Sequence, residues 1–169
     1  MLRVDLRDLS RGPVETRGEI PAQDPLFAGL EFNLEGPVRV SGRLQAAGEE
    51  RFYWHAQLAG RVAAACRRCL IPVVVPVETS VEALFTQEPD ALDDPDCYPL
   101  PPDAREVDLT PAVREEMILA APRYVVCRDD CRGLCPRCGH DLNASSCGCP
   151  PATDLRWQAL AGLKGKLRD

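Results

Sequence analysis

Several features common in other protein classes are scarce in or missing from the 169-residue sequence. Histidine and lysine occur twice each, and aromatic residues make up 5% of the chain. No apolar run approaches the roughly 20 residues of a transmembrane helix. The N-terminal residues 1–5 alternate charged with apolar side chains, unlike a secretion signal. Neither a glycine-rich phosphate loop nor a nucleophile elbow is present. We therefore expect a cytoplasmic protein without a membrane or small-molecule partner, and no enzyme.

Positive charge is also in short supply. The chain has 26 acidic and 20 basic side chains, which gives a net charge of −6. Residues 88–108 hold eight acidic residues and one arginine, so this stretch carries −7 and the remainder is close to +1. The net charge therefore argues against a general nucleic-acid binder, and any contact with nucleic acid must come from a local basic patch.

Cysteine, in contrast, is concentrated in close pairs. Nine cysteines make up about 5% of the chain, which is below the density of a small disulfide scaffold. Paired cysteines in a cytosolic protein are more often metal ligands or redox centres than disulfides. Eight of the nine form four pairs, which are Cys66/Cys69, Cys127/Cys131, Cys135/Cys138 and Cys147/Cys149. Eight thiolates are the number that two tetrahedral zinc sites require, and Cys97 is left over.

The spacing predicts how the eight cysteines divide. Six of them fall within 23 residues, too many for one tetrahedral ion, so one pair must join Cys66 and Cys69. We expect a bridging tetrad that ties a β-hairpin tip to the segment after a helix, and a local tetrad in the C-terminal segment. The bridging tetrad is Cys66, Cys69, Cys127 and Cys131, and the local tetrad is Cys135, Cys138, Cys147 and Cys149.

Two other interpretations of the cysteines stay open at this point. Cys131-x3-Cys135-x2-Cys138 matches the triplet that radical enzymes use for an iron–sulfur cluster, but those enzymes need a large α/β barrel. His140 could replace one cysteine as a ligand, although a histidine just after a Cys-x2-Cys zinc knuckle is usually a surface residue. All-cysteine zinc sites are normally closed and structural, which favours a protein without catalytic metal.

The first half of the chain has the alternation of apolar and polar residues that is typical of strands. A period of two sustained over several segments predicts an antiparallel sheet with one covered face. The expected strands are 2–6, 14–20, 38–44, 52–64 and 73–85, with turns at 46–50 and 66–72. Trp54 lies on the apolar face and is expected in the core.

The second half predicts helices and a linker. The acidic stretch 88–108 contains five prolines and is expected to be a solvated linker or mobile loop. A helix is expected over 110–121, with Thr110 as N-cap and Pro111 in its first turn. A second helix is expected from Asp154.

The fold class is thus α+β: a mainly antiparallel sheet (with a barrel-like form as one option), one central helix, a zinc-knuckle segment and a C-terminal helix. The expected domains are 1–122 and 123–169, packed together through the bridging tetrad.

Three segments together resemble one family. They are Cys66-Arg67-Arg68-Cys69-Leu70, residues 107–122, and residues 127–157 with their six cysteines and Asp154-Leu155-Arg156-Trp157. This pattern resembles the YceD family of large ribosomal RNA subunit accumulation proteins. The resemblance implies a role in ribosome biogenesis and in the accumulation of large-subunit ribosomal RNA, and the family is not known as an enzyme.

Two partners fit this resemblance. Arginines in or beside the metal loops could form a phosphate-binding patch for ribosomal RNA, or they could only balance thiolate charge. The candidates are Arg67, Arg68, Arg128, Arg132 and Arg137. The alternative is a protein-only adaptor that binds a basic large-subunit ribosomal protein through the acidic stretch.

Overall fold

The computed structural model describes residues 2–48, 50–87 and 97–150. The chain divides into two compact units. Unit 1 comprises residues 1–64 and 72–125, and unit 2 comprises residues 65–71 and 126–169. The loop between two strands of the sheet therefore belongs to the cysteine-rich unit. The helix expected from Asp154 lies outside the described residues.

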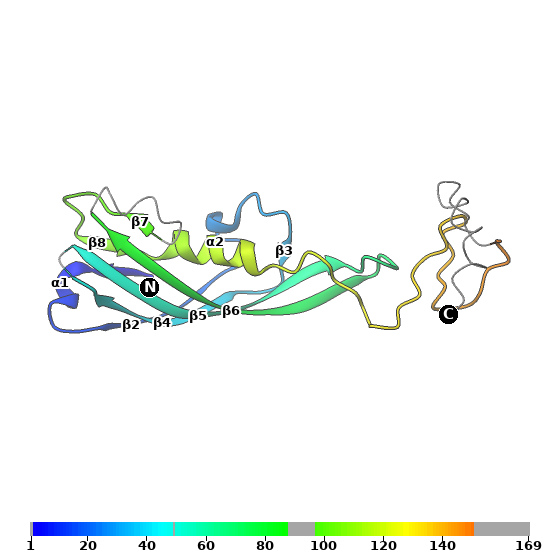
Figure 1. Ribbon diagram of the computed structural model, residues 1–169, viewed down its shortest axis with the longest axis horizontal. Coiled ribbons are helices and arrows are strands. Elements are labelled where there is room, and N and C mark those ends of the chain that lie inside the picture. The colour runs from blue at the N-terminus through cyan, green and yellow to red at the C-terminus, as the bar shows by residue number, and fades with distance from the viewer. Residues whose placement is uncertain (1, 49, 88–96, 151–169) are drawn as a thin grey trace, which may run out of the picture. The chain divides into compact units, whose positions relative to one another are not determined.

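Unit 1 is built on a six-stranded sheet (Figure 1). Its strands pair in the order β2-β4-β5-β6-β7, and β3 also pairs with β5. Pairing is antiparallel for β2–β4, β3–β5 and β4–β5, and parallel for β6–β7. The strand bounds are β2 Val14–Ile20, β3 Asn33–Leu34, β4 Val38–Ala46, β5 Arg51–Ala65, β6 Pro72–Thr86 and β7 Cys97–Pro99. In the part of the chain described, β2 and β7 stay unpaired with each other, so the sheet is open and the barrel option is wrong.

The predicted alternation sets which face of the sheet is covered. Leu44 of β4 lies opposite Trp54 of β5, and both side chains are fully buried. Thr16 of β2 is buried in the same layer, and its hydroxyl accepts a hydrogen bond of 2.9 Å from the Trp54 indole. The indole donor is thus satisfied inside the core, as a buried tryptophan requires. The expectation that Trp54 is a core residue is confirmed.

The central helix α2, Thr110–Ala120, packs against β6 (Figure 1). It buries Ala112, Val113 and Met117. Gly60 of β5 has no side chain, and a methyl group at this position would lie only 3.3 Å from the Met117 side chain. The glycine therefore lets the helix approach the sheet closely.

The start of α2 differs from the prediction. The helix begins at Thr110, after Leu109, and Thr110 itself is not the cap. The Asp108 carboxylate accepts hydrogen bonds from both the backbone amide and the hydroxyl of Thr110. Asp108 competes successfully because a carboxylate is a stronger acceptor than a hydroxyl and suits the positive end of the helix dipole.

Two further expectations are corrected. The first strand, β1 Arg3–Asp5, ends before residue 6 because Asp5 caps the short helix α1 Leu6–Leu9. The solvated-linker prediction is wrong for residues 97–99 and 106–108, which form β7 and β8 Glu106–Asp108. β8 pairs with β1 in a separate two-stranded sheet.

Pro99 is tolerated in β7 because, among the described residues, β7 is an edge strand, where one side of the backbone needs no ladder partner. Residues 88–96 lie outside the described part. The remaining short element of unit 1 is the 3₁₀ helix η1, Pro25–Phe27. No helix in the described ranges has both the length and the apolar character needed to cross a bilayer.

We predict that Thr16→Val destabilises unit 1 by about 1–3 kcal/mol, because the buried Trp54 N–H loses its acceptor while the side-chain volume is retained. Urea unfolding followed by circular dichroism measures the change. Thr79→Val is the matched control, because Thr79 donates to Glu116, which keeps access to water. Equal losses for the two variants would contradict a special role for the buried bond.

Candidate metal centres

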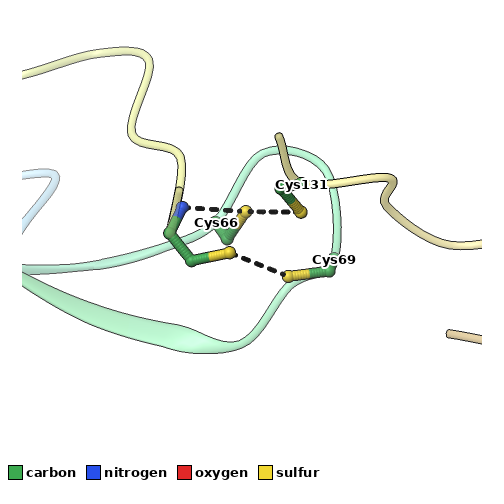
Figure 2. A group of neighbouring side chains, drawn as sticks. Cys66, Cys69 and Cys131 are labelled. Carbon is green, nitrogen blue, oxygen red and sulfur yellow. Dashed lines mark hydrogen bonds between the residues drawn. The ribbon is translucent and has the colours of Figure 1, made fainter. Parts of the chain in front are cut away.

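The bridging tetrad collects four sulfur atoms from two separate stretches of unit 2. Cys66 and Cys69 lie on the loop between β5 and β6, and Cys131 lies close to them (Figure 2). The Sγ atoms of Cys66 and Cys131 are 3.9 Å apart, and those of Cys69 and Cys127 are 3.7 Å apart. All four sulfurs lie within 4.8 Å of one another.

The local tetrad has the same compactness. The sulfurs of Cys135, Cys138, Cys147 and Cys149 also lie within 4.8 Å of one another. The two groups have the membership that the sequence-based partition predicts. Cys131 belongs to a different group from Cys135 and Cys138, so the described residues do not assemble the cluster-binding triplet. That either tetrad binds a metal stays a prediction at this point.

Each tetrad contains one Cys-x2-Cys turn, called a knuckle here: residues 66–71 in the bridging tetrad and residues 135–140 in the local tetrad. The two knuckles have the same backbone hydrogen bonds. In the first, Leu70 N donates to Cys66 O and Cys66 N donates to Ile71 O, at 2.9 Å each. In the second, Gly139 N donates to Cys135 O at 2.9 Å and Cys135 N donates to His140 O at 2.8 Å. Leu70 and Gly139 occupy the same turn position, with φ of 63° and 71°. Glycine adopts this conformation readily, whereas leucine is strained in it.

The sulfur distances suit a single tetrahedral ion. A zinc–sulfur bond of about 2.3 Å places the sulfurs of a tetrahedral site about 3.8 Å apart. The Cys69–Cys127 and Cys66–Cys131 sulfur distances of 3.7 and 3.9 Å bracket this value. Both are far longer than a disulfide bond of about 2.05 Å. Thiolates select zinc over hard cations such as magnesium, so the residues present fit two zinc ions.

Backbone amides favour ionisation of one thiol in each knuckle. The amide of Cys69, followed by those of Arg68 and Cys127, lowers the pKa of Cys66 to about 6. The amides of Cys138 and Arg137 lower the pKa of Cys135 to about 6. Burial, together with the neighbouring sulfurs, raises the pKa of Cys127 to about 12. The four thiols of one tetrad therefore resist ionising together until a cation neutralises them.

The second knuckle is joined to the first by a close backbone contact. Leu134 N donates to Arg68 O at 3.0 Å. Gly133 is buried with φ of 72°, and a methyl group on it would lie 2.7 Å from the Arg68 carbonyl oxygen. Only glycine satisfies both requirements, since other residues would be strained and would clash.

The five candidate arginines divide into two groups. Arg68 donates to the carbonyl oxygens of Asp129 and Cys131, at 2.8 and 2.9 Å. Arg128 lies 3.2 Å from the Asp130 carboxylate and donates to the Asn143 side chain at 3.0 Å. Both therefore stabilise the loops that carry the cysteines. Arg67, Arg132 and Arg137 belong to the same unit, and all five arginines are exposed.

Two other candidate side chains lie outside the tetrads. His140 is exposed, and its Nε2 atom is 2.8 Å from the Ser145 hydroxyl. Among the described residues, neither His140 nor Cys97 joins a group of potential metal ligands.

Asn143, which the sequence reasoning did not single out, contacts the bridging tetrad. Its Nδ2 atom is 3.6 Å from Cys131 Sγ. The signal for Asn143 was the Asp141-Leu142-Asn143 sequence, because Asp and Asn two residues apart commonly form side-chain-bonded turns.

An open β-sheet unit and two closed four-cysteine groups define a protein with candidate structural metal centres. Residues 54–164 match the YceD family, described as large ribosomal RNA subunit accumulation protein YceD. The chain belongs to this family.

Individual relatives extend this finding. The uncharacterized protein YlbN of Bacillus subtilis is 31% identical over 112 residues, which cover 65% of this chain and 63% of YlbN. The uncharacterized protein Rv2926c of Mycobacterium tuberculosis is 33% identical over 108 residues, which cover 62% of this chain and 51% of Rv2926c.

A third relative carries a functional name. It is the chloroplastic large ribosomal RNA subunit accumulation protein YCED homolog 1 of Zea mays, 39% identical over 62 residues. That match covers 36% of this chain and 20% of the maize protein. The chain thus spans about half to three fifths of the bacterial relatives. No solved structure matches it significantly.

We predict that Gly133→Ala destabilises metal-loaded unit 2 more than Gly139→Ala does. Gly133→Ala adds a clash with the Arg68 carbonyl to the strain of a positive φ, whereas Gly139→Ala adds only the strain, about 1–2 kcal/mol. Thermal unfolding of the zinc-loaded protein and zinc release to a chromophoric chelator measure the difference. Equal effects would show that backbone strain alone matters.

Proposed function

We propose that each tetrad binds one Zn²⁺ and that the two ions stabilise unit 2. The support is the compact, all-sulfur geometry of both groups. Described unit 2 has few other sources of stability, because its buried side chains other than the cysteines are scarce. Metal binding at a site that the unfolded chain lacks contributes directly to folding. Four sulfurs per ion leave no coordination position for a substrate, so this role is structural and non-enzymatic.

We further propose that the chain is a cytoplasmic ribosome biogenesis factor that promotes accumulation of large-subunit ribosomal RNA. The single observation that carries this proposal is membership of the YceD family over residues 54–164. The name of the maize relative points to the same process. The proposed mode of action is direct contact with ribosomal RNA by the cysteine-rich unit.

The arginine geometry indicates which side chains would contact RNA. Arg68 and Arg128 are engaged with loop carbonyls and side chains, so their removal would disturb the fold. Arg67, Arg132 and Arg137 are exposed, as Arg68 and Arg128 are, and they lie on or beside the knuckles; the test below uses Arg132 and Arg137. Metal-stabilised loops would hold these arginines at fixed positions, which reduces the entropy lost when phosphates bind.

We predict that Arg132→Glu combined with Arg137→Glu weakens binding to a transcript of the large-subunit ribosomal RNA. The slope of log affinity against log salt should fall by about one for each phosphate contact removed. Filter binding at several salt concentrations measures both quantities. Arg11→Glu with Arg39→Glu is the control, because it introduces the same charge change at exposed positions of unit 1.

Two outcomes would contradict direct RNA contact. One is wild-type affinity that does not change with salt, and the other is an equal loss in the control pair. Circular dichroism and zinc content of each variant ensure that the binding data refer to folded, loaded protein.

The second candidate is an adaptor that binds a basic large-subunit ribosomal protein. Its support is the concentration of acidic residues in 88–108 within a chain of net charge −6. Part of this charge is used internally, because Glu106 and Asp108 lie 3.6 and 3.1 Å from the Arg3 guanidinium. The adaptor proposal therefore rests mainly on the acidic residues before residue 97 of the sequence.

The adaptor proposal predicts that changing Asp90, Asp93, Asp94 and Asp96 to asparagine abolishes co-purification of a basic ribosomal protein. The substitutions spare β7 and β8, so the described fold should be unchanged. Affinity purification with quantitative mass spectrometry gives the result. Arg132→Glu with Arg137→Glu serves as the comparison, since retained partners in the asparagine variant and lost partners in the arginine variant would contradict the adaptor.

A further inference from the structure

The loop of the local tetrad sends one side chain to the bridging tetrad. Asn143 lies between Cys138 and Cys147 in the sequence, yet its Nδ2 atom is 3.6 Å from the sulfur of Cys131. This distance is within the range of an N–H···S hydrogen bond. Asn143 therefore connects a loop enclosed by one set of four cysteines to a ligand of the other set.

The orientation of the Asn143 amide is fixed by its neighbours. Its Oδ1 atom accepts from Arg132 N at 2.8 Å and from the Arg128 guanidinium at 3.0 Å. Its Nδ2 atom also donates to Asp141 Oδ1 at 2.7 Å. Exchanging the amide oxygen and nitrogen would set donors against donors, so the NH₂ group must face Cys131.

The turn that carries Asn143 is held at several points. Asp141 Oδ1 accepts from Asn143 N at 2.9 Å, and the two bonds from Asn143 lower the pKa of Asp141. Leu142 N donates to Gly133 O at 2.9 Å, and Leu134 pairs with Asp141 in a β-bridge. The turn is thereby attached to residues 133–134, where Leu134 N also donates to Arg68 O.

A hydrogen bond to a coordinating sulfur strengthens metal retention. Four thiolates around one Zn²⁺ carry a net charge of −2, and a donor to one sulfur disperses part of it. Partners of this kind typically change metal affinity by 10- to 100-fold when they are removed. Asn143 can supply this donor only when its turn is ordered, and the turn is enclosed by Cys138 and Cys147.

We propose that Asn143 couples the two metal centres, so that an ion in the local tetrad raises the affinity of the bridging tetrad for its own ion. The inference rests on the proposed binding of two ions. Loading of the local tetrad orders the turn and presents the Asn143 NH₂ group to Cys131. Because coupling between sites is reciprocal, an ion in the bridging tetrad raises the affinity of the local tetrad by the same factor.

The experiment titrates the metal-free full chain with Co²⁺, whose visible absorption reports tetrahedral thiolate ligation, and with Zn²⁺ in competition with a chelator. Asn143→Ala should lower the affinity of the bridging tetrad by about 10- to 100-fold. Binding of the first ion, at the local tetrad, should be nearly unaffected. Asn143→Asp keeps the acceptor for Arg132 N but loses the donor to Cys131, and should show at least the same loss. Ser145→Ala is the matched control, because Ser145 lies in the same loop but bonds to His140.

A mutant cycle separates coupling from simple local support. In a Cys135→Ser/Cys138→Ser background the bridging tetrad should bind Co²⁺ more weakly, and Asn143→Ala should then have less than about a twofold further effect. An equal effect of Asn143→Ala in both backgrounds would overturn the coupling, as would wild-type binding of two ions that Asn143→Ala leaves unchanged. Binding of fewer than two ions would contradict the metal centres themselves. The strand signal in circular dichroism checks that unit 1 stays folded in every variant.

Discussion

The convergence of four sulfur atoms within 4.8 Å is the constraint on which unit 2 depends. Two unit charges about 4 Å apart repel by about 1 kcal/mol in water and about 4 kcal/mol near a protein surface. Four thiolates therefore cannot share such a space without a cation, and four thiols would gain little by doing so. Backbone amides offset part of the charge at Cys66 and Cys135, which is why these two thiols have a lowered pKa. The proposed divalent ion would balance the remaining charge.

The two knuckles meet this constraint with the same backbone turn but not with the same residues. Gly139 adopts the positive φ without strain, whereas Leu70 holds it with a branched side chain that is 64% exposed. Burial of the Leu70 side chain therefore does not explain why a leucine occupies this strained position. The contact of Gly133 with the Arg68 carbonyl joins the knuckles, so the cysteine-rich unit is one connected structure and not two independent loops.

The arginines of unit 2 bear both on its stability and on the proposed contact with RNA. Arg68 and Arg128 act on the loops themselves, through carbonyl oxygens and the Asn143 side chain. Arg132 and Arg137 are exposed to solvent, as Arg68 and Arg128 are. An overall acidic protein can contact RNA in this way, because binding depends on the charge of a local surface and not on the net charge. The acidic stretch is at the same time partly structural, since the Asp108 carboxylate accepts two hydrogen bonds from Thr110 at the start of α2.

Alternation in the sequence was enough to predict the longer strands β2, β4, β5 and β6, because a period of two specifies which side chains face the core, as at Leu44 and Trp54. Cysteine spacing was likewise enough to predict which sulfurs gather. Tertiary structure decided what spacing cannot encode. β8 pairs with β1 about 100 residues away, and the Asn143 side chain reaches Cys131. These contacts depend on where distant segments meet in space, and the local pattern of residues carries no record of that.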